Sequence, residues 1–115
     1  MSEYNKHPSE SYDSNKIVKI FDALSHPVRI KILGILYENR QYISELARKI
    51  GISRPLLYIH LRKLEEAELV KASMEISSDG KATKYYELIH FDLRLTPQLL
   101  HEISKDINLE EEKSQ

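Results

Sequence analysis

The chain has 115 residues and no cysteine, so it forms one domain with its own core, and disulfides, thiolate metal ligands and cysteine redox chemistry are excluded. Its net charge is −1, but residues 16–90 carry thirteen Lys and Arg against nine Asp and Glu, while both ends are acidic. A basic middle is typical of a chain whose middle meets phosphate, although a charge of this size is also common in domains that bind no nucleic acid.

The N-terminal residues 1–14 are polar and lack a periodic apolar face, so we expect a disordered tail there. They do not resemble a signal peptide, and no apolar run approaches the length of a membrane span. We therefore expect a cytoplasmic protein with no membrane contact.

Two helices are predicted next. The first begins near Asn15 and carries a wide apolar stripe of Ile17, Ile20, Phe21 and Leu24. The second begins at Pro27, with Ser25 or His26 as its N-cap. Between Val28 and Tyr37 this second helix is apolar on most of its circumference, so we expect it to be the central and most buried helix.

Residues 43–70 predict two short helices joined by a tight turn. The first has an apolar stripe at helical spacing, formed by Ile43, Leu46, Ala47 and Ile50. Gly51 follows at a favourable place for a left-handed cap, Ser53 is a good N-cap, and Pro55 lies in the next first turn. The second helix buries Leu57, Leu61 and Leu64. Helix, turn and helix is the geometry that places the second helix in a DNA major groove.

A β-hairpin is predicted after this pair of helices. The apolar period changes to two, and we expect one half-buried face made of Val70, Ala72, Met74 and Ile76. Asp79-Gly80 is a hairpin turn signal, and the return strand covers residues 83–89. Tyr85 and Tyr86 point to alternate faces, so we expect them to pack within the hairpin. A hairpin in this position is called a wing.

The last predicted helix starts at Pro97, with Thr96 as its N-cap. Its apolar stripe consists of Leu99, Leu100, Ile103 and Ile107, and residues 110–115 form an acidic tail. The stripes of the first and last helices exceed what one small domain can cover. We therefore expect a homodimer whose dimerisation residues are Ile17, Ile20, Phe21, Leu24, Leu99, Leu100, Ile103 and Ile107.

Three segments together resemble the ArsR-type winged-helix regulators of bacteria and archaea: ALSHPVRIKILGIL (23–36), ISELARKIGISRPLLYIHLRKLEEAELV (43–70) and GKATKYYEL (80–88). The resemblance implies an α+β, mainly α fold. This fold consists of a winged helix-turn-helix at 15–95, followed by a dimerisation helix at 96–109. It also implies a homodimeric repressor that binds double-stranded DNA. Glu68 stands where the family usually has Gly, which suggests an altered end of the recognition helix.

The predicted DNA contacts lie on the outer side of the recognition helix and on the wing. They are Ser53, Arg54, Leu56, Tyr58, Ile59, His60, Arg62, Lys63, Lys81 and Lys84. Arg54 and Tyr58 are expected to reach bases, and Arg62 and Lys63 phosphates. Exposed Leu56 and Ile59 have three interpretations: thymine methyl contacts, a protein partner, or no role. His60 is expected to be half-buried, with a bond to backbone or phosphate.

Metal and enzyme functions are not expected. His90, Asp92, His101 and Glu102 are the only candidate ligands that match other members of the family, but adjacent His101 and Glu102 point about 100° apart on a helix. No phosphate loop, HExxH motif or nucleophile motif is present, so we expect no catalysis and no cofactor. An unknown small-molecule effector in the dimer cleft stays open, as does the alternative of a protein-interaction module with weak DNA affinity. The sequence does not identify the operator, the regulated genes or whether the protein represses or activates.

Overall fold

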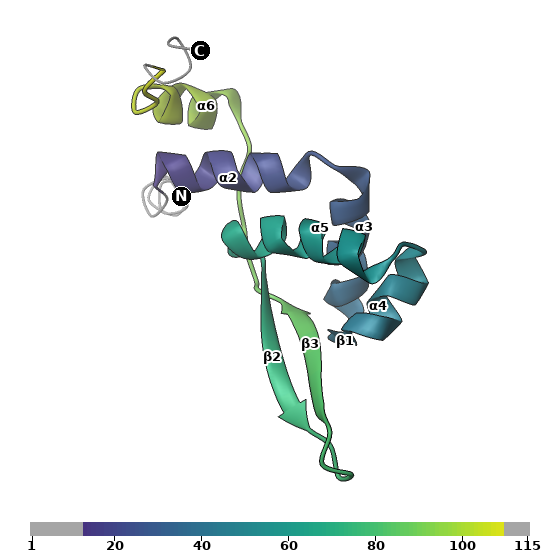
Figure 1. Cartoon of the computed structure of the whole chain (residues 1–115). Helices are drawn as coiled ribbons and strands as arrows, with labels where there is room; N and C mark the ends of the chain where they lie inside the picture. The colour runs from purple at the N-terminus through teal and green to yellow at the C-terminus, as the bar shows by residue number, and fades with distance from the viewer. Residues whose placement is uncertain (1–12, 110–115) are drawn as a thin grey trace. The chain divides into compact units, whose positions relative to one another are not determined.

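The computed structural model describes residues 13–109, so most of the predicted N-terminal tail and the acidic C-terminal tail lie outside the described residues. The order of elements is α2 (Ser14–Leu24), α3 (Pro27–Glu38), β1 (Gln41–Tyr42), α4 (Ile43–Ile50), α5 (Arg54–Glu66), β2 (Val70–Ile76), β3 (Ala82–Leu88) and α6 (Pro97–Ser104) (Figure 1). The strands form one antiparallel sheet in the order β1-β3-β2. The predicted mainly helical winged helix-turn-helix is thus confirmed. Among these residues no helix is long and apolar enough to cross a membrane.

The chain divides into two compact units. One is Lys19–His90, which holds α3 to α5 and the sheet, and the described part of the other consists of residues 13–18 and 91–109. In the second unit the start of α2 meets the end of α6, where Ser14 Oγ donates to Asp106 Oδ2 at 2.9 Å. The boundary falls inside α2, which the sequence alone did not indicate.

The helix-turn-helix forms for the local reasons that the sequence predicts. Gly51 has a φ of 86°, and its N–H donates to the carbonyl of Ala47 at 2.8 Å, so α4 ends in a left-handed cap. The Ser53 hydroxyl accepts from the N–H of Leu56 at 3.4 Å and caps α5. Leu57, Leu61 and Leu64 are fully buried. The inner face of α5 is therefore fixed in the core.

α3 packs against α4, α5 and β3 and is central, but the expectation that it is the most buried helix is wrong. Its buried residues are Arg29, Ile32 and Leu36, while Ile30 and Tyr37 are exposed. The reason is that α4, α5 and β3 cover only part of the apolar circumference. His26 is the N-cap, and its Nδ1 accepts from the N–H of Val28 at 3.2 Å.

The end of α5 keeps the backbone that a glycine would favour, so the expected alteration is not found. Glu68 has a φ of 61° and is the only non-glycine residue of the described chain with a positive φ. The N–H of Glu68 donates to the Glu65 carbonyl and that of Leu69 to the Leu64 carbonyl, both at 2.9 Å. This is a Schellman motif with glutamate in the left-handed position. The side chain is tolerated there at a cost in strain.

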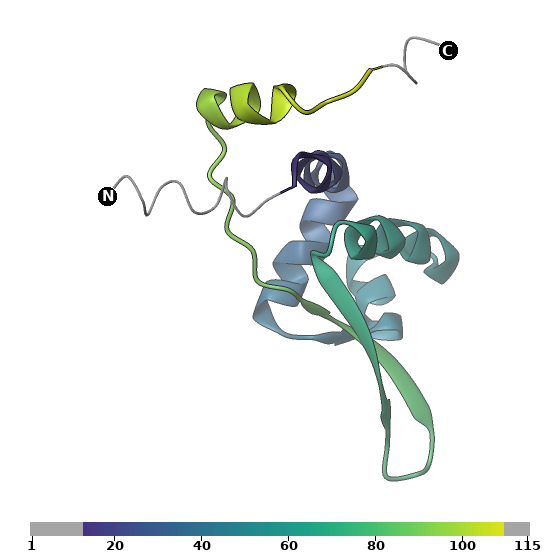
Figure 2. The same cartoon turned by 90° about the vertical axis from the view of Figure 1, so that its left-hand side faces the viewer.

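The hairpin of β2 and β3 extends away from the helices of its unit, as two views at right angles show (Figures 1 and 2). Val70 pairs with Leu88 at its base and Ile76 with Ala82 near its tip. Val70, Tyr85 and Tyr86 are buried, but Met74 is 59% and Ile76 76% exposed. The predicted half-buried face of β2 is therefore wrong for its outer half, because the core ends before the strand does.

Candidate nucleic-acid interface

The outer side of α5 collects most of the predicted DNA contacts. Ser53, Arg54, Leu56, Ile59, Arg62 and Lys63 are exposed, and Tyr58 is half-buried. Pro55 and the Ser53 cap start the helix, so Arg54 stands at its N-terminal end. This is the end that enters the groove in helix-turn-helix proteins, where helix N–H groups also favour phosphate.

Two exposed apolar side chains interrupt this polar surface. Leu56 is 43% and Ile59 58% exposed, while Leu57, between them in sequence, is buried. Side chains on the same helix at 56 and 59 lie three residues apart and share a side. An apolar patch among basic residues suits contact with thymine methyl groups.

His60 departs from the predicted set. It is 6% exposed and lies on the inner side of α5 with the core leucines. Its Nδ1 is 3.2 Å from Nη1 of Arg29, and its ring centroid is 4.6 Å from that of His26. Burial lowers the pKa of His60, and His26 and Arg29 lower it further. The expected half-burial of His60 is therefore wrong, and its predicted contact with backbone or phosphate stays a prediction. The spacing 57, 60, 61, 64 was the signal that places His60 inside.

Arg29 was missed by the sequence analysis. It is 8% exposed, and its Nε donates to the carbonyl of Ala23 at 2.7 Å and its Nη2 to that of Asp22 at 3.2 Å. These carbonyls belong to the last turn of α2, where Ser25 also donates to the Asp22 carbonyl, from its N–H at 3.2 Å and from its hydroxyl at 2.7 Å. The guanidinium thus caps α2 from within the core.

Lys84 links the wing to α5. Its Nζ is 5.4 Å from the ring centroid of Tyr58 on α5 and 5.5 Å from that of Tyr86 on β3. A hydrogen bond with Tyr86 raises the pKa of Lys84, and burial raises the pKa of Tyr86. Two cation–π contacts hold this ammonium between the helix and the hairpin. Lys84 is half-buried, so any phosphate contact has to be made from this position.

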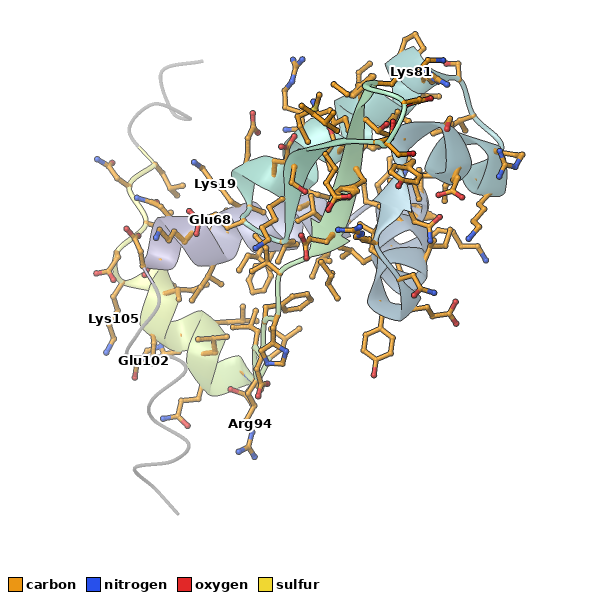
Figure 3. The ribbon with its side chains drawn as sticks, turned by 90° about the horizontal axis from the view of Figure 1, so that it is seen from below. Lys19, Glu68, Lys81, Arg94, Glu102 and Lys105 are labelled. Carbon is orange, nitrogen blue, oxygen red and sulfur yellow. The ribbon has the colours of Figure 1, made fainter. Side chains whose placement is uncertain are left out.

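The wing tip combines one ammonium with one carboxylate. Lys81 is exposed beside the hairpin turn and lies well apart from Glu68 in the view from below (Figure 3). The Asp79 carboxylate accepts from the Ser77 hydroxyl and from the N–H of Lys81, and these bonds lower the pKa of Asp79. Residues 70–88 contain three Lys and no Arg against three acidic residues. The wing therefore carries no net positive charge.

Lys63 forms an ion pair with Asp22, with Nζ 3.3 Å from Oδ2. The side chains are 49% and 59% exposed, so the pair is weak and Lys63 stays available to phosphate.

A second cluster lies along the middle of the hairpin, on its other face, where Tyr85 pairs with Ser73. The Arg40 guanidinium lies 3.8 Å from the ring centroid of Tyr85 and donates to both carboxylate oxygens of Glu75 at 3.3 Å. The ring of Tyr42 stacks on Tyr85 at 5.5 Å. Hydrogen bonding to Tyr85 and Arg40 lowers the pKa of Glu75. Tyr85 and Tyr86 pack within the hairpin, as predicted.

The predicted dimerisation residues divide into two groups. Ile17, Ile20, Leu99 and Ile103 are buried in the protomer and present almost no surface to a partner, so their role in a dimer stays a prediction. Leu100 is 46% and Ile107 41% exposed, while Phe21 and Leu24 are half-buried. Val18 and Leu95 are additional exposed apolar residues that the sequence analysis did not include.

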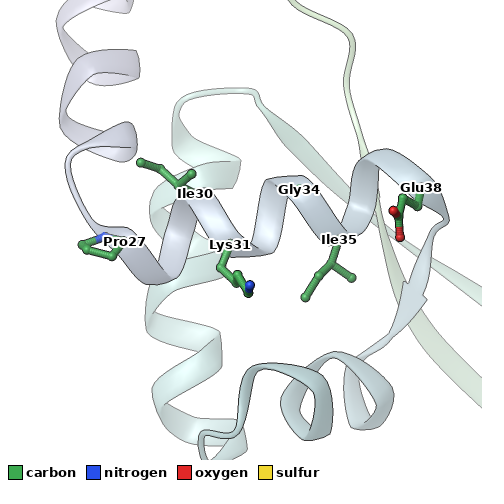
Figure 4. Close-up of a pocket in the computed structure, with 6 residues that line it drawn as sticks. All are labelled: Pro27, Ile30, Lys31, Gly34, Ile35 and Glu38. Atoms are coloured by element: carbon green, nitrogen blue, oxygen red, sulfur yellow. The ribbon is translucent and has the colours of Figure 1, made fainter.

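No group of three or more His, Cys, Asp or Glu side chains in the described part of the chain is placed to hold a metal ion. A shallow groove of about 530 Å³ runs along α3 and is lined by Pro27, Ile30, Lys31, Gly34, Ile35 and Glu38 (Figure 4). Its charged groups, Lys31 and Glu38, are both exposed.

Comparisons with known proteins agree with this geometry. Residues 26–72 match the model of the family described as bacterial regulatory protein, arsR family. An uncharacterized HTH-type transcriptional regulator of Methanocaldococcus jannaschii is 37% identical over 87 residues, covering 76% of this chain and 90% of the relative.

Two solved structures are also similar. The transcriptional repressor BigR from Xylella fastidiosa has a TM-score of 0.54 and 25% identity, covering 79% of this chain and 82% of that one. A homodimeric winged helix-turn-helix DNA-binding domain from Mycobacterium bovis has a TM-score of 0.58 and 17% identity, covering 80% of this chain and 75% of that one.

Proposed function

The chain is a member of the ArsR family of DNA-binding transcriptional regulators, and from this premise we propose that it acts as a homodimeric, sequence-specific repressor. The observation that carries the proposal is the outer side of α5, which presents Arg54 and Arg62 while its inner face is locked in the core. A helix fixed in this way can hold side chains in register with base edges. Repression would follow from occupying sites that the polymerase needs.

The alternative of a protein-interaction module is not supported by the comparisons, since the relatives are transcriptional regulators. The proposal also includes a cytoplasmic location and no catalytic activity. A small-molecule effector in the dimer cleft stays a prediction.

The DNA part of the proposal is tested by footprinting on the gene's own upstream region, followed by a salt series on the protected duplex and on random duplex. We expect a protected site and an affinity that falls steeply with salt on both duplexes, because bound Lys and Arg release counterions. Little binding at any salt would contradict the proposal and favour the partner-module alternative.

The dimer part rests on exposed Leu100 of α6 and exposed Ile107 beyond it, with support from the homodimeric structural relative. We expect wild type to sediment as a dimer at tens of micromolar (roughly the concentration range at which a stable interface is populated). Leu100→Lys should sediment as a monomer at the same concentration. Gln98→Lys is the matched control, because Gln98 is also exposed on α6. A wild type that sediments as a monomer, or a control that dissociates equally, would contradict this part.

A further inference from the structure

One buried guanidinium joins three segments of the Lys19–His90 unit. Arg29 on α3 holds the carbonyls of Asp22 and Ala23 at the end of α2, at 3.2 and 2.7 Å. Its remaining Nη1 faces Nδ1 of His60 on α5 at 3.2 Å. The same planar group therefore contacts the end of α2 and the inner side of the recognition helix.

The contact with His60 requires one protonation state. A guanidinium has only donors and keeps its charge, so Nδ1 of His60 must accept, and its ring proton must stand on Nε2. A proton added at Nδ1 would remove the acceptor and place two buried cations 3.2 Å apart. Burial, His26 and Arg29 all favour the neutral ring.

Few charged or titratable groups surround His60. His26, from the N-cap of α3, and Arg29 are the titratable and charged side chains that act on it. Asp22 and Lys63 stand nearby as an exposed ion pair. From α4 and β2, which the structure describes in full, no charged group acts on the ring. Among the described residues, therefore, no carboxylate acts on His60 to compensate its protonated form.

We propose that Arg29 and neutral His60 couple the end of α2 to the recognition helix, and that this coupling sets the angle at which α5 meets operator DNA. The inference rests on the proposed function, since it takes α5 as the helix that enters the groove. Arg29 and His60 are positioning residues, because both are buried and act through α5. Phe21 and Leu24, predicted dimerisation residues, flank the two carbonyls that Arg29 holds. A shift of α2 in the dimer would thus displace α5 through the side chain of Arg29.

The direction of the pH effect follows. With neutral His60, α5 keeps the orientation that its buried leucines set. A protonated His60 would push Arg29 and α5 apart from this arrangement, and bound DNA would oppose that displacement. Neutral His60 is then favoured more strongly in the complex. Operator affinity should be full at pH 7.5 and fall on acidification. The total fall should be about tenfold for each unit by which the His60 pKa is lower in the DNA complex than in the free protein.

The experiment uses the full chain and compares wild type with three variants between pH 5 and 8. His60→Gln keeps an oxygen that can accept from Arg29 but cannot titrate. Arg29→Met removes the donors and keeps an apolar stem. His26→Asn is the matched control, because asparagine preserves the N-cap while removing the neighbouring imidazole. Operator affinity is measured together with NMR titration of the His60 ring and of the Asp22 and Ala23 carbonyl carbons.

We expect operator affinity to fall on acidification (the acid step) in wild type and in His26→Asn. This acid step should be absent in His60→Gln. The Asp22 and Ala23 carbonyl signals should follow the His60 ring with one midpoint, and this link should vanish in Arg29→Met. An acid step that persists in folded His60→Gln, or carbonyl signals that ignore His60, would overturn the inference. If wild type bound no duplex at low salt while the carbonyls still followed His60, the proposed function would fail and the coupling would stand.

Discussion

The recognition helix and the wing are the two elements through which this regulator meets DNA in our proposal, and they are held in opposite ways. The inner line of α5 is completely buried at Leu57, Leu61 and Leu64. The hairpin is buried only at its base, and its outer half exposes Met74 and Ile76. Burial along its whole length makes α5 as rigid as the core, whereas the wing tip can move with little loss of packing. The helix is thus built for fixed contacts and the wing for adaptable ones.

The two elements also differ in charge. The exposed side of α5 presents Arg54 and Arg62, whereas residues 70–88 carry equal numbers of basic and acidic groups. One of the three lysines of the wing, Lys84, already contacts Tyr58 and Tyr86. Sequence preference is therefore expected to come mainly from the helix.

The largest expected effect tests the difference in packing. Leu61→Ala should lower the free energy of unfolding by about 2–5 kcal/mol, because it opens a cavity in the core. Ile76→Ala should change it by less than about 0.5 kcal/mol, because the side chain is exposed. Urea denaturation of both variants measures the contrast. Equal losses would mean that the wing is packed as firmly as the helix.

The difference in DNA contact comes next. Arg54→Ala should cost about 1–3 kcal/mol on the operator and little on random duplex, because a lost base contact removes discrimination. Lys81→Ala should weaken both duplexes alike and reduce the salt slope by roughly one, as expected for a phosphate contact. Titrations of both DNAs at several salt concentrations distinguish them. If Arg54→Ala weakens the two duplexes equally, α5 does not contact bases.

The link between the two elements can be measured by a double-mutant cycle. Tyr58→Leu and Lys84→Met each remove one partner of the contact between α5 and the wing. Their coupling in unfolding free energy should be about 0.5–1 kcal/mol, which is typical of a partly exposed cation–π pair. Tyr58→Leu with Lys71→Met is the control cycle, since Lys71 is exposed at the base of β2. Equal coupling in both cycles would contradict a specific bridge.

The smallest effect is expected at the junction of the two elements. Glu68→Gly should raise the free energy of unfolding by about 0.5–1 kcal/mol, because relief of left-handed strain exceeds the entropy that glycine adds to the unfolded chain. Glu66→Gly, inside α5, should instead destabilise by about 1 kcal/mol. Thermal denaturation of the pair gives the sign. Destabilisation by Glu68→Gly would show that the glutamate side chain makes a contact that outweighs the strain.

Local chemistry explains what could be predicted. The turn at Gly51, the cap at Ser53 and the start at Pro27 depend on neighbours in sequence, so they follow from residue type alone. The role of Arg29 could not be predicted in this way, because its partners lie 6, 7 and 31 residues away and meet only after the helices pack. His60 could have been placed inside from its spacing with the leucines.

Burial was the harder quantity to predict. Alternation in β2 identifies a strand but does not show where the core ends, so Met74 and Ile76 were expected inside. The converse applies to Ile17 and Leu99, which are buried in the protomer although they were assigned to a partner surface. Apolar periodicity gives the direction of a side chain, and only the fold shows what covers it.

The position of β2 at the edge of its sheet bears on how the protein behaves in a test tube. In the order β1-β3-β2 its outer backbone groups pair with no other described strand. A seven-residue edge with exposed Met74 and Ile76 is a template for cross-β aggregation, and Lys71 and Glu75 are the charges that oppose it. Concentrated protein should therefore begin to aggregate at this strand, and Ile76→Lys should delay the rise in light scattering.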